Sequence, residues 1–327
     1  MDFLQQYGLF LAKTITLLAA VLIAAAGLAT IGARGRQRPR ERLEVTLLNE
    51  RLDELRDTLQ HKLLDRKSLR RLLKARAKER KALDKSGKPR IFVLDFHGDI
   101  KASQVENLRQ EITAILTVAE PKDEVVVRLE SSGGLVPHYG LAASELARLR
   151  GRVRQLTVII DRIAASGGYL MACVADRILA APFAIIGSIG VVAQMPNFHR
   201  LLKRHDIDYE LITAGKYKRT LTMFGENNDE GREKFRQELE ETHHLFKDFI
   251  RRHRPGLNVE AVATGEYWLG EKALELKLVD AITTSDDYLL NASADAELLH
   301  LRFHHKQPLS KRLSLTLESL RRALSGF

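Results

Sequence analysis

The stretch Val158–Val192 (VIIDRIAASGGYLMACVADRILAAPFAIIGSIGVV) constrains the fold more than any other part of the chain. It begins with the β-branched run Val158–Ile160, which is typical of an interior parallel strand. Ser166 follows among small residues, and the apolar segment after it predicts a helix. A buried strand, a small-residue turn and a helix in this order indicate an α/β protein with helices on both faces of its sheet.

Ser166 is the first candidate for chemistry. A hydroxyl at a helix start, with backbone N–H groups beside it, suits a nucleophile whose attack creates an oxyanion. An N-cap serine with two glycines for close packing explains the same residues without any chemistry. These residues alone leave both interpretations open. The single cysteine, Cys173, lies inside the apolar helix, so we predict a buried structural thiol and no intrachain disulfide.

Composition excludes some functions. The 327-residue chain carries a formal net charge of +10, which suits anionic lipid headgroups or simple solubility. Aromatic residues make up 6% and do not interleave with basic stretches, so we predict no nucleic-acid partner. The pairs His243-His244 and His304-His305 lack the spacing of helical zinc ligands, and no phosphate-binding glycine motif is present. We therefore predict neither a metal nor a cofactor.

Residues 1–33 predict a membrane anchor. Thr14–Ala33 has no charged residue, and twenty helical residues span about 30 Å, the thickness of a bilayer core. A cleaved signal peptide is the alternative, but the run is long for one and only Lys13 precedes it. The five arginines within Arg34–Arg42 favour a cytoplasmic position for the part of the chain that follows the anchor.

The remaining chain divides into three predicted parts. Residues 34–87 form a charged helical juxtamembrane segment, whose leucine seam (Leu48, Leu52, Leu55, Leu59) packs on the body or on a second subunit. Residues 88–290 form the α/β domain, and residues 291–327 a basic tail. Strands are expected at Arg90–Phe96, Glu124–Leu129, Leu156–Ile160 and Tyr209–Thr213, and helices at Ser103–Thr117, Tyr139–Leu149, His199–His205 and Asp229–His253.

Three small-residue turns recur in this domain: Ser131–Gly134, Ala165–Gly168 and Gly187–Gly190. Ligand sites of open α/β sheets form at the carboxyl ends of strands, where such turns collect. A serine nucleophile needs a base, and the segment Ile212–Thr220 (ITAGKYKRT) offers Lys216 and Lys218. A buried lysine can serve, because desolvation disfavours its ammonium form. Spacing alone does not choose between the two lysines.

Three motifs resemble the signal peptide peptidase A family of membrane-bound serine proteases. They are RLESSGG at Arg128–Gly134, ASGGYLMACVADRILAAPFAIIGSIGV at Ala165–Val191, and AGKYKRT at Ala214–Thr220. The resemblance implies a Clp/crotonase-like α/β fold, with a mostly parallel sheet and flanking helices, after an N-terminal transmembrane helix.

The resemblance also implies a site. It makes Ser166 the nucleophile, Lys218 the general base and Ser188 the residue that orients the lysine. Gly133 and Gly134 match the turn that completes the oxyanion hole beside the N–H of Gly167. The family usually has proline where this chain has Ser132, so the turn is expected to be less preorganised here.

The implied protein is a single-pass endopeptidase of the bacterial inner membrane that cuts membrane-associated or unfolded peptides, such as remnant signal peptides. Members of the family form homo-oligomeric rings or bowls. Close relatives have often been regarded as acting on the periplasmic side, against the charge rule. A crotonase-type acyl-CoA enzyme and a non-catalytic peptide-binding membrane adaptor remain the alternatives.

Overall fold

The computed structural model describes residues 6–22, 41–65, 67–72, 74 and 88–305. The chain divides into two compact units, Met1–Arg42 with His304–Phe327, and Leu43–Phe303. In the first unit, residues 6–22 are helical and overlap the predicted anchor, whose remaining residues 23–33 lie outside the described residues, as do 34–40 and 306–327. No helix among the described residues has both the length and the apolarity needed to cross a bilayer.

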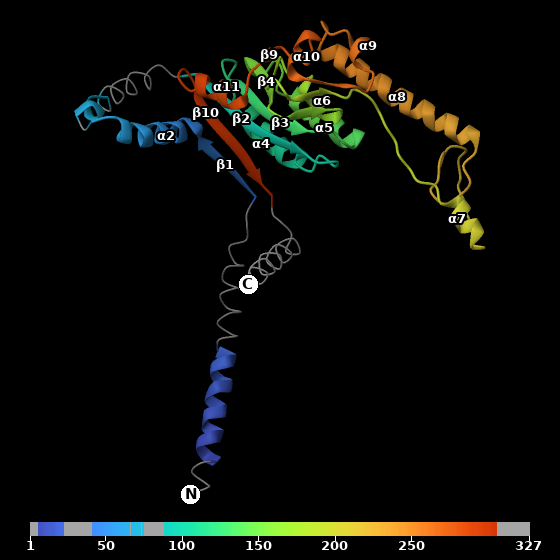
Figure 1. The fold of residues 1–327 in the computed structure, drawn as a ribbon, viewed down its shortest axis with the longest axis horizontal. Coiled ribbons are helices and arrows are strands. Elements are labelled where there is room, and N and C mark those ends of the chain that lie inside the picture. The colour runs from blue at the N-terminus through green and yellow to red at the C-terminus, as the bar shows by residue number, and fades with distance from the viewer. Residues whose placement is uncertain (1–5, 23–40, 66, 73, 75–87, 306–327) are drawn as a thin grey trace. The chain divides into compact units, whose positions relative to one another are not determined.

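The second unit is organised around one mixed, mostly parallel sheet (Figure 1). All the registered pairs along its main path, from β10 to β9, are parallel. In spatial order this path contains β1 (Arg42–Leu47), β10 (Glu297–His304), β2 (Arg90–Gly98), β3 (Glu124–Ser131), β4 (Gln155–Ile160), β6 (Arg177–Ala180) and β9 (Ala281–Ile282).

A short branch leaves this path at the end of β3. Strand β5 (Ile163–Ala165) pairs with β3 through Ser131 and Ala164, and runs parallel to β7 (Ile185–Gly187). Strand β8 (Tyr267–Leu269) closes the branch antiparallel to β7. The branch therefore carries the second and third small-residue turns to the carboxyl end of β3.

The central strands are buried on both faces. In β2 the side chains of Phe92, Leu94 and Phe96 belong to the larger core, whereas Ile91 and Val93 belong to the smaller one. This division follows the two-residue period of a strand. The larger core also contains α4 (Val105–Val118), α5 (Val136–Ala147) and α6 (Gly167–Ala172), and the smaller one contacts α2 (Leu48–Leu63) and α11 (Ser285–Ala292).

Residues 191–228, here called the arm, extend from the body (Figure 1). The arm contains α7 (His199–Arg204), and α8 (Asp229–His253) leads back from it. Near its end α8 contacts the larger core through Phe246, Phe249 and Ile250. The chain then forms α9 (Val259–Val262) and α10 (Gly270–Glu275).

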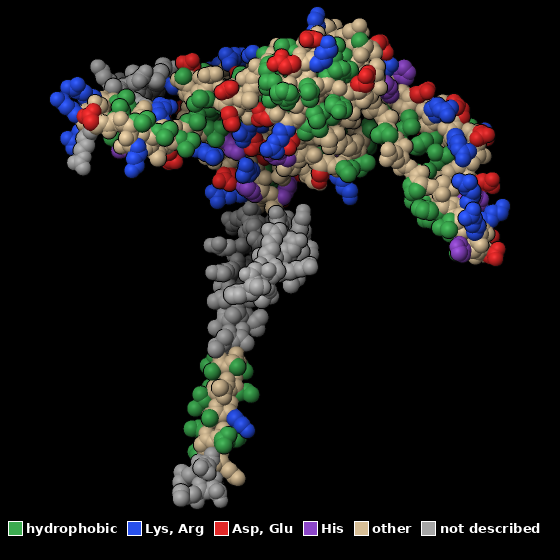
Figure 2. All heavy atoms as spheres, viewed as in Figure 1, with side chains coloured by type: hydrophobic (Ala, Val, Ile, Leu, Met, Phe, Trp, Pro, Cys, Tyr) green, Lys and Arg blue, Asp and Glu red, His purple; other side chains and the backbone are tan. Residues whose placement is uncertain are grey.

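The arm holds itself together. Asn197 donates to the carbonyls of Thr222 and Gly225 at 2.9 and 3.0 Å, and the rings of Phe198 and Tyr209 both pack on Phe224. Many of its apolar side chains nevertheless face solvent, and Figure 2 shows hydrophobic side chains gathered on it. They include Val192, Met195, Leu201, Ile207, Leu211 and Ile212.

The predicted fold class, a mostly parallel α/β sheet with flanking helices, is confirmed. The predicted helices and the first three predicted strands are present, with ends shifted by a few residues. The predicted strand Tyr209–Thr213 is wrong, since these residues are irregular and belong to the arm, where no neighbouring strand can pair with them. Strands β1, β5, β8, β9 and β10 were not predicted; of these, β1 lies in the segment predicted to be helical, and β10 lies beyond the predicted limit of the α/β domain at residue 290.

Candidate active site

Ser166 is the single residue between β5 and α6. Its backbone has φ 53° and ψ −119°, a conformation that costs a non-glycine residue free energy and persists only when its surroundings enforce it. Its N–H donates to the carbonyl of Gly187 at 2.7 Å, and its carbonyl accepts from Leu170 at 3.0 Å. Ser166 therefore lies at a sharp strand-to-helix turn and is a partly exposed residue.

Ser188 lies beside Ser166. Strands β5 and β7 are parallel, with Ala165 opposite Gly187, so the two serines follow paired positions. Ser188 also has a positive φ, 50°, and its N–H donates to the carbonyl of Glu266 at 2.6 Å. The structure thus brings these two predicted site residues together at the carboxyl ends of neighbouring strands.

Gly133 and Gly134 form the turn that faces Ser166. Gly133 has φ +88°, and a Cβ atom there would lie 2.7 Å from the Gly167 nitrogen and 2.8 Å from the Ser166 Cβ. The backbone of Gly134 packs just as closely on that of Ile100. The turn of β3 therefore contacts the start of α6, as the predicted oxyanion hole requires.

The amides of Gly133, Gly134 and Gly167, which surround Ser166, differ in their hydrogen bonds. The Gly133 N–H donates to the Ser131 hydroxyl at 3.1 Å. The N–H groups of Gly134 and Gly167 donate to no other residue of the described chain. Gly167 is the first residue of α6, where an N–H has no acceptor within the helix.

Lys218 is not near Ser166 within one chain. It is exposed in the arm, and its N–H donates to the Gly215 carbonyl at 3.1 Å. Figure 1 shows the segment between α7 and α8 at the outer end of α8, away from β3 and α6. The described residues provide its ammonium with neither an ion pair nor a hydrogen bond.

Lys216 is differently placed. Its ammonium forms a 2.7 Å ion pair with Glu230, and this hydrogen-bonded carboxylate raises the pKa of Lys216 above its ordinary value. A raised pKa opposes service as a base at neutral pH. Of the two lysines that spacing left open, the structure disfavours Lys216.

Cys173 is fully buried, as predicted for a structural thiol. Burial raises the pKa of its thiol well above the ordinary value, so the reactive thiolate is suppressed. This residue offers no competing nucleophile.

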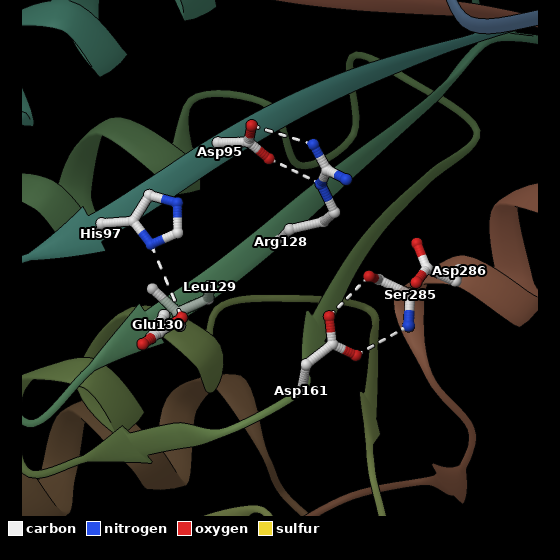
Figure 3. A pocket seen from close by; sticks show the side chains of 8 residues that line it. All are labelled: Asp95, His97, Arg128, Leu129, Glu130, Asp161, Ser285 and Asp286. Atoms are coloured by element: carbon white, nitrogen blue, oxygen red, sulfur yellow. Dashed lines mark hydrogen bonds and ion pairs between the residues drawn. The ribbon is translucent and has the colours of Figure 1, made fainter. Parts of the chain in front are cut away.

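A cavity of about 280 Å³ lies elsewhere on the sheet, over the carboxyl halves of β2, β3 and β4 (Figure 3). None of the predicted site residues lines it. Its charged groups pair with one another: Arg128 donates twice to Asp95, at 2.6 and 2.9 Å, and Ser285 donates twice to Asp161. Among the described residues, no three His, Cys, Asp or Glu side chains are grouped to hold a metal ion. We interpret the cavity as a polar part of the sheet surface, lined by side chains that pair with one another.

Sequence reasoning missed two residues that support the glycine turn. Ser131 is 2% exposed and accepts the Gly133 N–H, and its hydroxyl lies 2.6 Å from that of the fully buried Tyr139. The sequence held one signal, a second serine in SSGG directly after a buried strand. The tyrosine lay in a predicted helix, and only folding brings its hydroxyl to the turn.

Comparison with known proteins defines the class. Residues 2–146 match the model of the peptidase family S49 N-terminal region, and residues 148–299 that of peptidase family S49. A probable protease SohB from Haemophilus influenzae is 46% identical, covering 97% of this chain and 94% of its own length. Another, from Buchnera aphidicola of Schlechtendalia chinensis, is 47% identical, covering 89% and 100%.

Among solved structures, a mutant of the 1510-N membrane-bound stomatin-specific protease is 14% identical, with a TM-score of 0.43, covering 63% of this chain and 84% of its own.

The sequence matches define the protein as a serine peptidase. The chain belongs to peptidase family S49, and over nearly its full length it is similar to SohB proteases.

Proposed function

We propose that this chain is a membrane-anchored serine endopeptidase on a Clp/crotonase-like fold, with Ser166 as nucleophile and Lys218 as general base. The observation that carries the proposal is the strained turn at Ser166, which holds a partly exposed hydroxyl against the Gly133–Gly134 turn. Strain of this kind collects at active sites, where the surrounding structure holds a reacting group in place.

The chemistry follows from these groups. The Ser166 hydroxyl attacks a peptide carbonyl and gives its proton to the uncharged amine of Lys218, which Ser188 orients. The N–H groups of Gly134 and Gly167 stabilise the oxyanion that forms. The lysine then protonates the leaving amine, and water hydrolyses the acyl-enzyme by the same steps.

Within one folded chain, Lys218 is not placed to act as the base for Ser166. A lysine acts as a base where burial disfavours the ammonium, and Lys218 is exposed. The arm that carries it displays apolar side chains typical of an interface. We therefore propose that the arm of one copy covers the Ser166 turn of a neighbouring copy in a homo-oligomer, burying both surfaces.

The proposed substrate is an extended, largely apolar peptide bound beside Gly133, in a membrane-associated or unfolded protein such as a remnant signal peptide. Exposed apolar side chains of Ile100, Leu135 and Val136 flank the glycine turn and suit such a substrate. Residues 1–33 would anchor the enzyme in the bacterial inner membrane. The arginine flank favours a cytoplasmic catalytic domain.

Labelling of the full-length protein with a fluorophosphonate tests the nucleophile, alongside cleavage of fluorescent casein. Ser166→Ala should abolish labelling and lower cleavage at least about 10³-fold. The control is Ser144→Ala, which removes an exposed hydroxyl on α5 that donates to the Gly140 carbonyl, and should leave both unchanged. Equal labelling and cleavage in wild type and Ser166→Ala would leave the adaptor as the better interpretation.

Mixing inactive variants tests the origin of the base. Ser166→Ala and Lys218→Ala should each be inactive alone and recover part of the wild-type activity when co-assembled, because neighbouring copies then combine an intact serine with an intact lysine. Lys216→Ala, which removes the ion pair with Glu230 and the contact with the Tyr217 ring, should stay active. A mixture as inactive as its components would mean that each dyad forms within one copy.

A further inference from the structure

Tyr139 contacts two segments beside Ser166: the start of α6 and the end of β3. It is a fully buried residue of α5. A Cβ atom on Gly167 would lie 2.5 Å from the Tyr139 Cγ, so the ring packs directly under the first residue of α6. Its hydroxyl reaches the opposite side, 2.6 Å from the Ser131 hydroxyl and 2.8 Å from the Asp99 carbonyl. One side chain therefore contacts both backbones that flank the nucleophile.

The hydrogen bonds around this hydroxyl have one direction. A phenol has a single proton, and a carbonyl can only accept, so Tyr139 donates to Asp99. Ser131 must then donate to Tyr139, and its own oxygen accepts the Gly133 N–H at 3.1 Å. Burial raises the pKa of Tyr139, which keeps the phenol protonated at neutral pH. The chain of donors runs from Gly133 through Ser131 and Tyr139 to Asp99, with each donor satisfied.

A second tie connects the same two segments. The Leu135 N–H donates to the Ile100 carbonyl at 2.9 Å, so this bond joins residues directly beyond Asp99 and two residues beyond Gly133. Together the ties fix the turn after β3 against the turn after β2. A fully satisfied buried network of this kind makes its surroundings rigid. This matters because Ser132 has none of the backbone restriction that a proline would supply.

We infer that Tyr139 and Ser131 are positioning residues of the oxyanion hole. They draw the Gly133 N–H inward, which leaves the next amide, that of Gly134, to stand with the Gly167 N–H at the developing oxyanion. The inference rests on the proposed function of Ser166 as nucleophile.

Tyr139→Phe tests the inference, since it keeps the ring under Gly167 and removes only the hydroxyl. The matched control is Tyr169→Phe. Tyr169 is equally buried, and its hydroxyl donates at 3.0 Å to the carbonyl of Leu278, which does not belong to either turn. Full-length variants are compared for kcat, KM, melting temperature and inhibition by a peptide aldehyde, which forms a tetrahedral adduct with a reactive serine.

Tyr139→Phe should lower kcat about tenfold or more, leave KM within about twofold, and weaken aldehyde inhibition by the same factor as kcat. Tyr169→Phe should lower the melting temperature comparably without affecting kcat or aldehyde inhibition. Equal catalytic effects of the two variants would overturn the inference while leaving Ser166 as nucleophile. Failure of the proposed function itself would be seen separately, because fluorophosphonate would then label wild type and Ser166→Ala equally.

Ser131→Ala supplies an independent variant if Tyr139→Phe folds poorly. It removes the acceptor of the Gly133 N–H and should reproduce the selective loss of kcat. The double variant should lose no more than either single one, because both break the same chain of donors. Fully multiplicative losses would contradict a shared network.

Discussion

At the scale of single residues, backbone conformation carries more of the site than side-chain chemistry does. Gly133, Ser166 and Ser188 all have positive φ: Gly133 follows β3 on the main path, and the two serines follow β5 and β7 of the branch that β3 starts. Gly133 combines this conformation with backbone contact to the nucleophile's helix. A side chain at residue 133 would be strained by the positive φ and would also collide with the backbone of Gly167.

Gly133→Ala should therefore abolish most activity. The added Cβ would lie 2.7 Å from a backbone nitrogen that cannot move without shifting Ser166. A shift of about 1 Å in the position of a catalytic group can cost about 100-fold in kcat/KM. Peptide cleavage by the full-length variant measures it.

Gly151→Ala is the control for strain alone. Gly151 has φ +70°, but a Cβ there would meet nothing within 4 Å. It should cost about 1 kcal/mol of stability through backbone conformation and leave kcat/KM unchanged. Equal activity losses at both glycines would show that the contact at Gly133 has no catalytic importance.

At the scale of elements, a half-buried ionic cluster connects three neighbouring strands. Asp95 on β2 accepts from Arg128 on β3 and pairs with His300 on β10 at 2.9 Å. Burial alone would raise the pKa of Asp95, but the hydrogen bonds from His300 and Arg128 outweigh it and hold the pKa below its ordinary value. The carboxylate therefore stabilises the fold through its charged form.

Asp95→Asn should destabilise the protein at pH 7 by about 2 kcal/mol, because Arg128 loses its carboxylate. A lowered pKa contributes stability that is complete above the ordinary Asp value near 4 and is lost as pH falls below it. The difference between variant and wild type should shrink between about pH 4 and pH 2. Urea unfolding across this range measures it.

The control is Asp286→Asn, which alters an exposed carboxylate of the same cavity and should cost less than about 0.5 kcal/mol at any pH. A loss for Asp95→Asn that stayed constant to pH 2 would contradict the role given to its charge.

The same elements show what periodicity could predict. The strands Glu124–Ser131 and Gln155–Ile160 contain the apolar, β-branched runs Val125–Val127 and Val158–Ile160, and the sequence predicts both strands. Strand β10 was not predicted because His300 and Arg302 interrupt its apolar pattern. In the structure both side chains contact Asp95. Strand β1 was not predicted because its sequence, RLEVTL, contains charged residues; it forms an edge strand of the sheet with little burial.

At the scale of the whole second unit, Leu43–Phe303, the arm exposes apolar area that a single copy does not bury. Ile212 is 90% exposed and Val192 79%, in a segment that Asn197 ties together through hydrogen bonds to Thr222 and Gly225. Exposed apolar surface of this extent marks an interaction site. We expect the arm to contribute to assembly and to activity together.

Ile212→Glu should shift the detergent-solubilised full-length protein to a lower mass in light scattering and reduce peptide cleavage in parallel, because a charge at the centre of an apolar interface opposes burial. Leu290→Glu is the control, as it alters an apolar residue on α11 that is 54% exposed. Unchanged mass with Ile212→Glu would exclude the arm as an assembly surface.

The sequence by itself determined the local units: the strand, the small-residue turn with Ser166, and the helix. These depend on periodicity and backbone preference over a few residues, which sequence records directly. The candidates Ser188, Gly133, Gly134 and Gly167 came from the resemblance of their motifs to a protease family. Only the tertiary structure decided that Tyr139 supports the turn and that Lys218 stands apart from Ser166 in one copy. Such relations depend on how distant segments pack, and no local pattern encodes that distance.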